Sequence, residues 1–499
     1  MDTHNNTNYS RSNIRIADEI PLKQPVSLSG TSHASVLDNA IKPRIRNSVF
    51  SITSISTVDR SPLHMLYNCV APNAILNAGG RADEVRCHPG TRKEVIRVIE
   101  RWMDAPDNTN PPMMWLSGPA GAGKTAIVQT VAERCKRRDV PHANFFFFRA
   151  DSSRCSTFPL VATLVYQICQ IYPAVRETVA TTLSDNPLIL HGSIEEQLSL
   201  LPVEPLRNAQ RFSASDLRVV LLIDGLDECS SETKISHRQI LYAIDNALVN
   251  NYCPLRVLVA SRFEHQITMA FNQLSASVHP LYLDEQYSPE SDIRHFVVSQ
   301  FMQVKKTHPL AYQLHATWPS VKDMDHIVKK SSGQFIYAST VMRYISNSSA
   351  SPRLSLERVH CLAQVSTSSP FSQLDAVYTY ILSQADDQEA LKDIIHCDML
   401  IKAMLRWRTN VDFQDRAPTL ERIVGMLNPR CSADVLRSCL ADLTSIAAFE
   451  SGYLSFHHAS LRDYFLDQTR SGSYFVDLDA FSVEAFPEIW EHIGKEHSV

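Results

Sequence analysis

The sequence predicts an α/β fold in which a parallel sheet lies between two layers of helices, followed by helical domains. Three observations predict it: apolar runs alternate with helical patterns over 113–285, each run is continuously apolar, and a glycine-rich turn follows the first run. Continuous apolar strands are typical of parallel sheets because both of their faces are buried. The expected strands are 113–116, 144–148, 219–223, 257–260 and 279–283, and the expected helices are 125–138, 158–171, 236–250 and 264–273.

The glycine-rich turn, Gly118-Pro119-Ala120-Gly121-Ala122-Gly123-Lys124-Thr125, fits G-x-x-x-x-G-K-[ST], the phosphate-binding P-loop. Its glycines let backbone N–H groups converge on phosphate oxygens, and the N-terminus of the next helix adds partial positive charge. Lys124 is expected to reach the β- and γ-phosphates, and Thr125 to place its hydroxyl on Mg²⁺. The motif therefore predicts that ATP or ADP, with Mg²⁺, binds along Gly118 to Ala126.

A second stretch, 218–228, is an apolar strand that ends in acidic residues. Because open α/β sheets bind ligands beyond the carboxyl ends of their strands, Asp224 is placed to hold Mg²⁺. Asp227 and Glu228 can complete the metal shell or polarise an attacking water. Together with Lys124 and Asp224, they are the candidate catalytic residues. The alternative for Asp227 and Glu228 is a solvated turn.

A third stretch, Leu258-Val259-Ala260-Ser261-Arg262, delivers a polar and a cationic residue to the same edge of the predicted sheet. A guanidinium binds phosphate oxygens in bidentate fashion, so Arg262 is a candidate sensor of the γ-phosphate. The alternative is a surface arginine that caps a loop.

These three stretches resemble the NACHT domain, a branch of the signal-transducing P-loop NTPases, and the resemblance is strongest to fungal NACHT proteins. Asp227 falls three residues after Asp224, which is the offset that NACHT proteins show. Further segments resemble, in order, the family's lead-in, its small helical domain and the end of its winged-helix region: 86–92, 329–338 and 456–464.

The resemblance implies a switch in which ADP holds the sheet domain, the helical domain and the winged helix together. In related switches a winged-helix histidine touches the β-phosphate of ADP, and His458 occupies the matching place, five residues before Asp463. A histidine between aromatic residues can equally be a hydrogen-bonded core residue. The neighbouring His457 can be confused with it.

The expected domain organisation follows from these motifs and from the helical patterns. Thr91-Arg92-Lys93-Glu94 reads as a capping box that begins a helix in the lead-in, and 447–456 is expected to form a β-wing across Gly452. The expected parts are a disordered tail at 1–60, a lead-in helix and linker at 61–112, the nucleotide-binding domain at 113–285, a small helical domain at 286–350, a winged-helix domain at 351–475 and a tail at 476–499.

Composition excludes several other classes. The net charge of −5 implies no general affinity for nucleic acid, and no apolar run is long enough to span a membrane. The 11 cysteines include no C-x-x-C pair and no signal peptide opens the chain, so we expect a reducing, cytoplasmic setting.

The favoured function is a switch operated by ATP and ADP, in which nucleotide exchange controls opening and self-association and slow Mg²⁺-dependent hydrolysis resets the closed state. One alternative is a turnover P-loop ATPase, and another is a nucleotide-binding scaffold with little activity. Partners beyond the nucleotide, the upstream signal and the downstream effector are not identified by any motif in the sequence.

Overall fold

The computed structural model describes residues 62–77, 85–106, 109–212, 217–229, 236–249, 254–362, 371–406, 419–450 and 452–496. All of them belong to one compact unit, residues 59–499. The expected disordered tail, residues 1–60, lies outside the described residues. In this described part of the chain, no helix has the length and apolarity needed to cross a bilayer.

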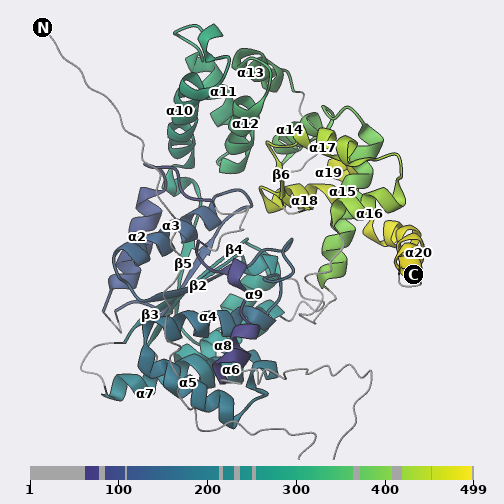
Figure 1. Cartoon of the computed structure of the whole chain (residues 1–499). Helices are drawn as coiled ribbons and strands as arrows, with labels where there is room; N and C mark the ends of the chain where they lie inside the picture. The colour runs from purple at the N-terminus through teal and green to yellow at the C-terminus, as the bar shows by residue number, and fades with distance from the viewer. Residues whose placement is uncertain are drawn as a thin grey trace, which may run out of the picture. The chain divides into compact units, whose positions relative to one another are not determined.

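A five-stranded parallel sheet forms the centre of the nucleotide-binding domain (Figure 1). Its strands run in the order β2-β3-β4-β1-β5, and their bounds are Met113–Ser117 (β1), His142–Phe146 (β2), Val219–Asp224 (β3), Leu255–Ser261 (β4) and Val278–Tyr282 (β5). The predicted parallel sheet is therefore confirmed. β2 ends at Phe146 rather than Phe148, because the chain bends away there and the backbone N–H of Phe148 donates to the carbonyl of Arg154.

Helices cover both faces of the sheet, which confirms the three-layer prediction. Alternate residues of β1 enter different cores: Met114 packs with α2 and α3, whereas Trp115 packs with the helices of the opposite face. The first face carries α2 (Lys93–Asp104) and α3 (Lys124–Arg137). The second carries α1 (Pro62–Asn68), α4 (Phe158–Ile171), α5 (Pro173–Asp185), α6 (Ile194–Leu198), α7 (Glu204–Phe212), α8 (Ser236–Val249) and α9 (His265–Asn272).

The start of α2 differs from the sequence prediction. The expected capping box is wrong: the hydroxyl of Thr91 donates to the carbonyl of His88, and the residue before the helix is Arg92, with a left-handed backbone at φ 52°. The Pro-Gly turn ahead of Thr91 leads the chain into α2 from a different direction than a capping box requires. The helix itself lies where it was expected and buries Val95, Ile99 and Trp102.

The rest of the chain is helical apart from one hairpin. The small helical domain contains α10 (Pro289–Thr307), α11 (Val321–Ser331), α12 (Phe335–Asn347) and α13 (Pro352–Cys361). Next come α14 (Ser372–Leu382), α15 (Gln388–Arg406), α16 (Leu420–Leu427), α17 (Ala433–Ala441), β6 (Ala447–Glu450), β7 (Tyr453–Phe456), α18 (Ala459–Phe465), α19 (Gln468–Ser471) and α20 (Leu478–Glu496). β6 and β7 pair antiparallel across Gly452, which has φ 82°, so the expected hairpin is confirmed.

The N-terminus of α12 packs directly on the P-loop. The backbone N–H of Ile336 donates to the carbonyl of Gly121 over 3.3 Å. Gly121 has φ 75°, and a Cβ added there would lie 2.2 Å from Cγ2 of Ile336. Glycine is therefore required at position 121 both by backbone conformation and by the close approach of α12.

We expect Gly121→Ala to destabilise the protein more than Gly123→Ala. Both residues have positive φ, but a Cβ at Gly123 would meet nothing within 4 Å. The shared backbone strain costs about 1–2 kcal/mol, and the contact with Ile336 adds about 1–3 kcal/mol at position 121 alone. Denaturant titration of each variant, with and without Ile336→Ala, measures the coupling. Equal losses for the two glycines would contradict the close packing.

Candidate nucleotide-binding site

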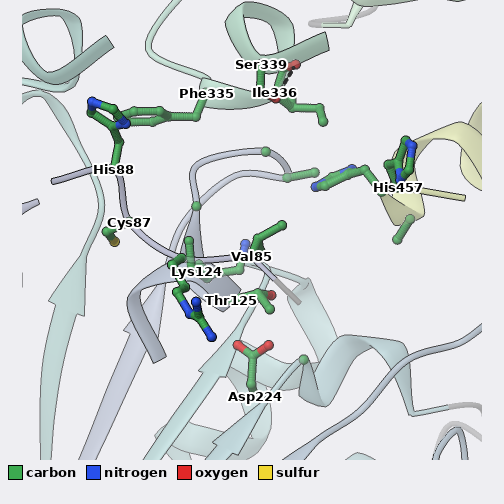
Figure 2. A pocket seen from close by; sticks show the side chains of 18 of the residues that line it. Val85, Cys87, His88, Lys124, Thr125, Asp224, Phe335, Ile336, Ser339 and His457 are labelled. Carbon is green, nitrogen blue, oxygen red and sulfur yellow. Dashed lines mark hydrogen bonds between the residues drawn. The ribbon is translucent and has the colours of Figure 1, made fainter. Parts of the chain in front are cut away.

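A cavity of about 530 Å³ lies above the carboxyl ends of the strands (Figure 2). Its walls come from parts of the chain that are far apart in sequence, among them the segment before α2, the P-loop, the residues after β2, β3 and β4, the helices α10 and α12, and the turn after β7. Figure 2 shows Lys124 and Thr125 at the floor, Asp224 below them, and Phe335 and Ser339 of α12 on the opposite side.

Most of the predicted P-loop residues reach this cavity. Its lining includes Ala120, Gly121, Gly123, Lys124, Thr125 and Ala126. Gly118 and Pro119 instead line a second hollow beside Phe263, and Ala122 is buried beneath the loop. The ammonium of Lys124 donates to the carbonyls of Gly118 and Pro119 over 2.9 and 3.0 Å. Burial lowers the pKa of this ammonium, while the charge of Asp227 opposes the change.

The acidic residues after β3 take different roles. Asp224 is buried at the carboxyl end of the strand and lines the cavity, as predicted. Asp227, only 3% exposed, accepts the backbone N–H of Arg262 at Oδ1 (2.8 Å) and pairs with its Nε at Oδ2 (3.0 Å). Oε2 of Glu228 accepts the backbone N–H of Arg149 over 3.2 Å. Burial, with help from the charge of Asp227, raises the pKa of Glu228 to about 8.

Arg262 joins the sheet domain to α18, in the region predicted to be a winged helix. Besides Asp227, its guanidinium contacts Asp463 of α18, with 2.8 Å between Nη1 and Oδ2. Arg149 lies near the same carboxylate, at 3.8 Å from Oδ1. Burial alone would lower the pKa of Arg262, but the carboxylates of Asp463 and Asp227 outweigh it and raise the pKa. The predicted phosphate sensor is therefore held by two carboxylates from two domains.

His458 also lines the cavity, at the residue that caps α18. Its Nδ1 accepts the backbone N–H of Ser460 over 3.0 Å. The ring nitrogen Nε2 of the neighbouring His457 lies 3.1 Å from the carbonyl of Thr444, in the turn before β6. Both histidines border the cavity, and the ring of His458 is the one fixed against its own helix.

Sequence reasoning missed Arg92. Its Nη2 donates to the carbonyl of Ala122 in the P-loop over 2.9 Å, and its guanidinium lies 5.0 Å from the ring centre of Phe335. Its backbone N–H donates to Asp292 of α10. One signal was available: a cation at the N-terminus of a helix is unfavourable, so an arginine there is held by another partner.

The residues that line the cavity fit an anionic ligand. Arg92 is 4% exposed, and its Nε and Nη1 have no hydrogen-bond partner among the described atoms. A buried guanidinium with unused donors suits phosphate or base acceptors. Thr125 and Asp224 supply the hard oxygen ligands that Mg²⁺ prefers, and Mg²⁺ usually takes only one or two protein carboxylates. A nucleotide with Mg²⁺ is thus compatible with the site.

Comparison with known proteins agrees with the motifs. Residues 91–262 match the family described as Nephrocystin 3, N-terminal. The vegetative incompatibility protein HET-E-1 of Podospora anserina is 24% identical over 310 residues, which cover 60% of this chain and 20% of that protein. The chain thus spans about a fifth of the length of this curated relative.

Among solved structures, the match to the Walker-type ATPase paby2304 of Pyrococcus abyssi covers 75% of this chain and 96% of the ATPase chain, with a TM-score of 0.36 and 12% identity. The match to AMPPCP-bound DnaA from Aquifex aeolicus covers 71% of this chain and 98% of the DnaA chain, with a TM-score of 0.25 and 10% identity. At these TM-scores the likeness carries no argument about function. The two sequence matches agree with the predicted resemblance: residues 91–262 are similar to the nephrocystin 3 N-terminal family, and 60% of the chain is similar to HET-E-1.

Proposed function

We propose that this protein is a switch operated by ATP and ADP, in which the bound nucleotide decides whether the winged-helix region stays docked on the sheet domain. The observation that carries this proposal is the position of Arg262. It lines the cavity that the P-loop also lines, and it is bound there by Asp463 of α18. A ligand at the P-loop therefore shares a cavity with an inter-domain ion pair.

The chemistry of the switch is a competition for one guanidinium. A γ-phosphate offers Arg262 more negative charge than the single carboxylate of Asp463, and arginine binds both in the same forked geometry. ADP lacks that group, so with ADP the contact between Arg262 and Asp463 would persist. A ligand shifts two states only by its difference in affinity for them, and this competition supplies such a difference.

The free energy of the Arg262–Asp463 ion pair is too small to drive the switch alone. Exposed ion pairs contribute about 0–1 kcal/mol, and breaking a buried pair costs about 3–5 kcal/mol. Arg262 and Asp463 are each 22% exposed, so their pair lies between these limits. Driving a switch from about 1:99 to 99:1 needs about 5.5 kcal/mol. A contact between His458 and the β-phosphate would supply part of the remainder.

Two features favour a switch over a turnover ATPase. A general base must be ionised and free to accept a proton. Burial and the charge of Asp227 raise the pKa of Glu228, which disfavours its ionised form, and both oxygens of Asp227 are engaged by Arg262. Hydrolysis in this arrangement would be slow, and bound Mg²⁺, held by Thr125 and Asp224, would supply charge stabilisation.

Opening would also free the surfaces that the winged-helix region covers, and we propose that self-association follows in the ATP state. No motif in the described part of the chain identifies the protein partners, the signal or the output of the switch. A cytoplasmic setting is consistent with the cysteines, since no disulfide joins those of the described residues.

We expect Asp463→Asn to shift the preference from ADP toward an ATP analogue by about 5- to 30-fold, equivalent to about 1–2 kcal/mol of lost closed-state stability. The measurement is competitive binding of ADP and a non-hydrolysable ATP analogue, with size-exclusion light scattering for self-association. Asp325→Asn is the matched control, because it removes an exposed arginine–aspartate pair with Arg294 outside the cavity. Equal preference in wild type and Asp463→Asn would contradict the competition.

The protein purified without added nucleotide should carry ADP, and Lys124→Ala should carry none. Bound nucleotide is identified by chromatography of the denatured sample, and steady-state hydrolysis is measured on the same preparation. We expect turnover below the typical 1–100 s⁻¹ of phosphoryl-transfer enzymes such as kinases. Rapid turnover would overturn the switch in favour of an ATPase. A protein that holds no nucleotide and stays monomeric with ADP and with the analogue would overturn nucleotide control altogether.

A further inference from the structure

We propose that Ser460 and Tyr378 are positioning residues that hold His458 in the tautomer with its proton on Nε2, so that the winged-helix region presents a neutral hydrogen-bond donor to the nucleotide phosphates. The inference rests on the proposed function, because it assigns to His458 a contact with the ligand in the cavity. What it adds is a chain of hydrogen bonds that runs from Tyr378 of α14 through Ser460 of α18 to the imidazole of His458.

The first link fixes the protonation of Nδ1. The backbone N–H of Ser460 lies 3.0 Å from Nδ1, and its hydroxyl oxygen lies 2.7 Å from the same atom. A backbone N–H can only donate, so Nδ1 must present its lone pair and carry no proton. A neutral imidazole then bears its hydrogen on Nε2, at the opposite edge of the ring. Because His458 lines the cavity, Nε2–H is the group left for the ligand.

The second link orients the serine. The Tyr378 hydroxyl of α14 lies 2.9 Å from Oγ of Ser460. Ser460 has one hydroxyl proton, and giving it to Nδ1 leaves Oγ to accept the proton of Tyr378. Burial raises the pKa of Tyr378, so its hydroxyl keeps the proton that it donates. The chain therefore has one direction, from Tyr378 through Ser460 to His458, and its members support one another.

The surroundings oppose a charged imidazole. Burial and then Arg262 lower the pKa of His458 to about 4; Lys124 and Arg343 act in the same direction, and Asp463 opposes them. The ring also caps the N-terminus of α18, where positive charge is disfavoured. His458 would therefore bind phosphate through a hydrogen bond from a neutral imidazole, and the strength of this bond would depend on the orientation of the ring rather than on its ionisation.

The sign of the pH dependence follows. The folded pKa of His458, about 4, lies below the ordinary value of 6.5, so the unfolded chain binds this proton more readily. The stability linked to the neutral ring is fully present above pH 6.5 and is lost as the pH falls toward 4. The contribution of His458 to ADP binding should then not change between pH 6.5 and 8.

The direct test is the tautomer. In protein labelled with ¹⁵N in the histidine rings, two-bond ¹H–¹⁵N spectra distinguish Nδ1–H from Nε2–H, and the signal missing from His458→Gln identifies this residue. We expect an unprotonated Nδ1 and a protonated Nε2 throughout pH 6.5 to 8. A proton on Nδ1 would overturn the inference whatever the binding data show.

The functional test uses variants of the chain behind the ring, with ADP affinity as the readout. Ser460→Ala removes one of two donors to Nδ1 and should weaken ADP binding by about 3- to 10-fold, and Tyr378→Phe by less. Ser460→Thr, which keeps a hydroxyl, should restore the affinity. Tyr464→Phe is the matched control: Tyr464 is buried beside Tyr378, but its hydroxyl bonds to Thr379.

The outcomes separate the two proposals. If His458→Ala weakens ADP binding while Ser460→Ala and Tyr378→Phe bind like wild type, the positioning role is wrong and the nucleotide contact stands. If His458→Ala binds ADP like wild type, the contact is wrong, and the positioning role for that contact falls with it. The competition at Arg262 is unaffected by either result, because Asp463→Asn tests it separately.

Discussion

The site depends on a constraint of the parallel sheet: every strand delivers its carboxyl end to the same edge. β4 lies between β3 and β1, so the P-loop, Asp224 and Arg262 meet at this edge although more than a hundred residues separate the first from the last. A hydrogen bond of 2.9 Å from the indole Nε1 of Trp115 to Oγ of Ser261 ties β1 to β4. The site is therefore positioned by backbone pairing, which is stiffer than a constellation built on loops.

The same geometry crowds charges of both signs into one partly enclosed space. Moving a charge out of water is expensive unless it is paired, and removing one member of a buried pair leaves the other uncompensated. Asp227 satisfies only part of the Arg262 fork, and Asp463 reaches the guanidinium from α18. The contact of α18 with the sheet domain thus contributes to the charge balance around Arg262, and the proposed switch would use this link.

Much of the fold could be predicted because its signals are local. The five strands, their continuous apolar character and the P-loop are each written within about ten consecutive residues, and the motif order specified the sheet edge. The helices between 173 and 212 were missed, although Pro173 stands at the first position of α5, where proline is favoured. Pro202 lies inside a π-helical turn, Ser199–Val203, and interrupts the helical pattern there. The capping box failed at Thr91 because its spacing matched while the preceding Pro-Gly turn imposed another backbone path.

The site residues also divide into those that a local motif predicts and those whose role depends on tertiary packing. Lys124, Thr125 and Asp224 were predictable because a motif places each of them on an identified strand or turn. Arg92 and Ser460 were not, since their roles depend on partners brought together by tertiary packing: Phe335 and Ala122 for the first, Tyr378 for the second. The sequence also placed His457 and His458 side by side without deciding between their orientations, which only the start of α18 determines.

Two helices from different domains, α12 and α18, contact the nucleotide site through different kinds of interaction. This difference predicts which domain moves when the nucleotide changes. α12 contacts the loop through a backbone hydrogen bond at Gly121 and an apolar side chain, Ile336, neither of which changes with the charge of a ligand. Asp463 of α18 contacts Arg262, which lines the cavity, and His458, the residue that caps α18, lines the cavity itself. Asp463 would compete with a phosphate for Arg262, and His458 would bind one. In the proposed competition for Arg262, adding a phosphate would weaken the second interface while leaving the first intact. The sheet domain and the small helical domain should move as one body, and the winged-helix region should be the part that leaves.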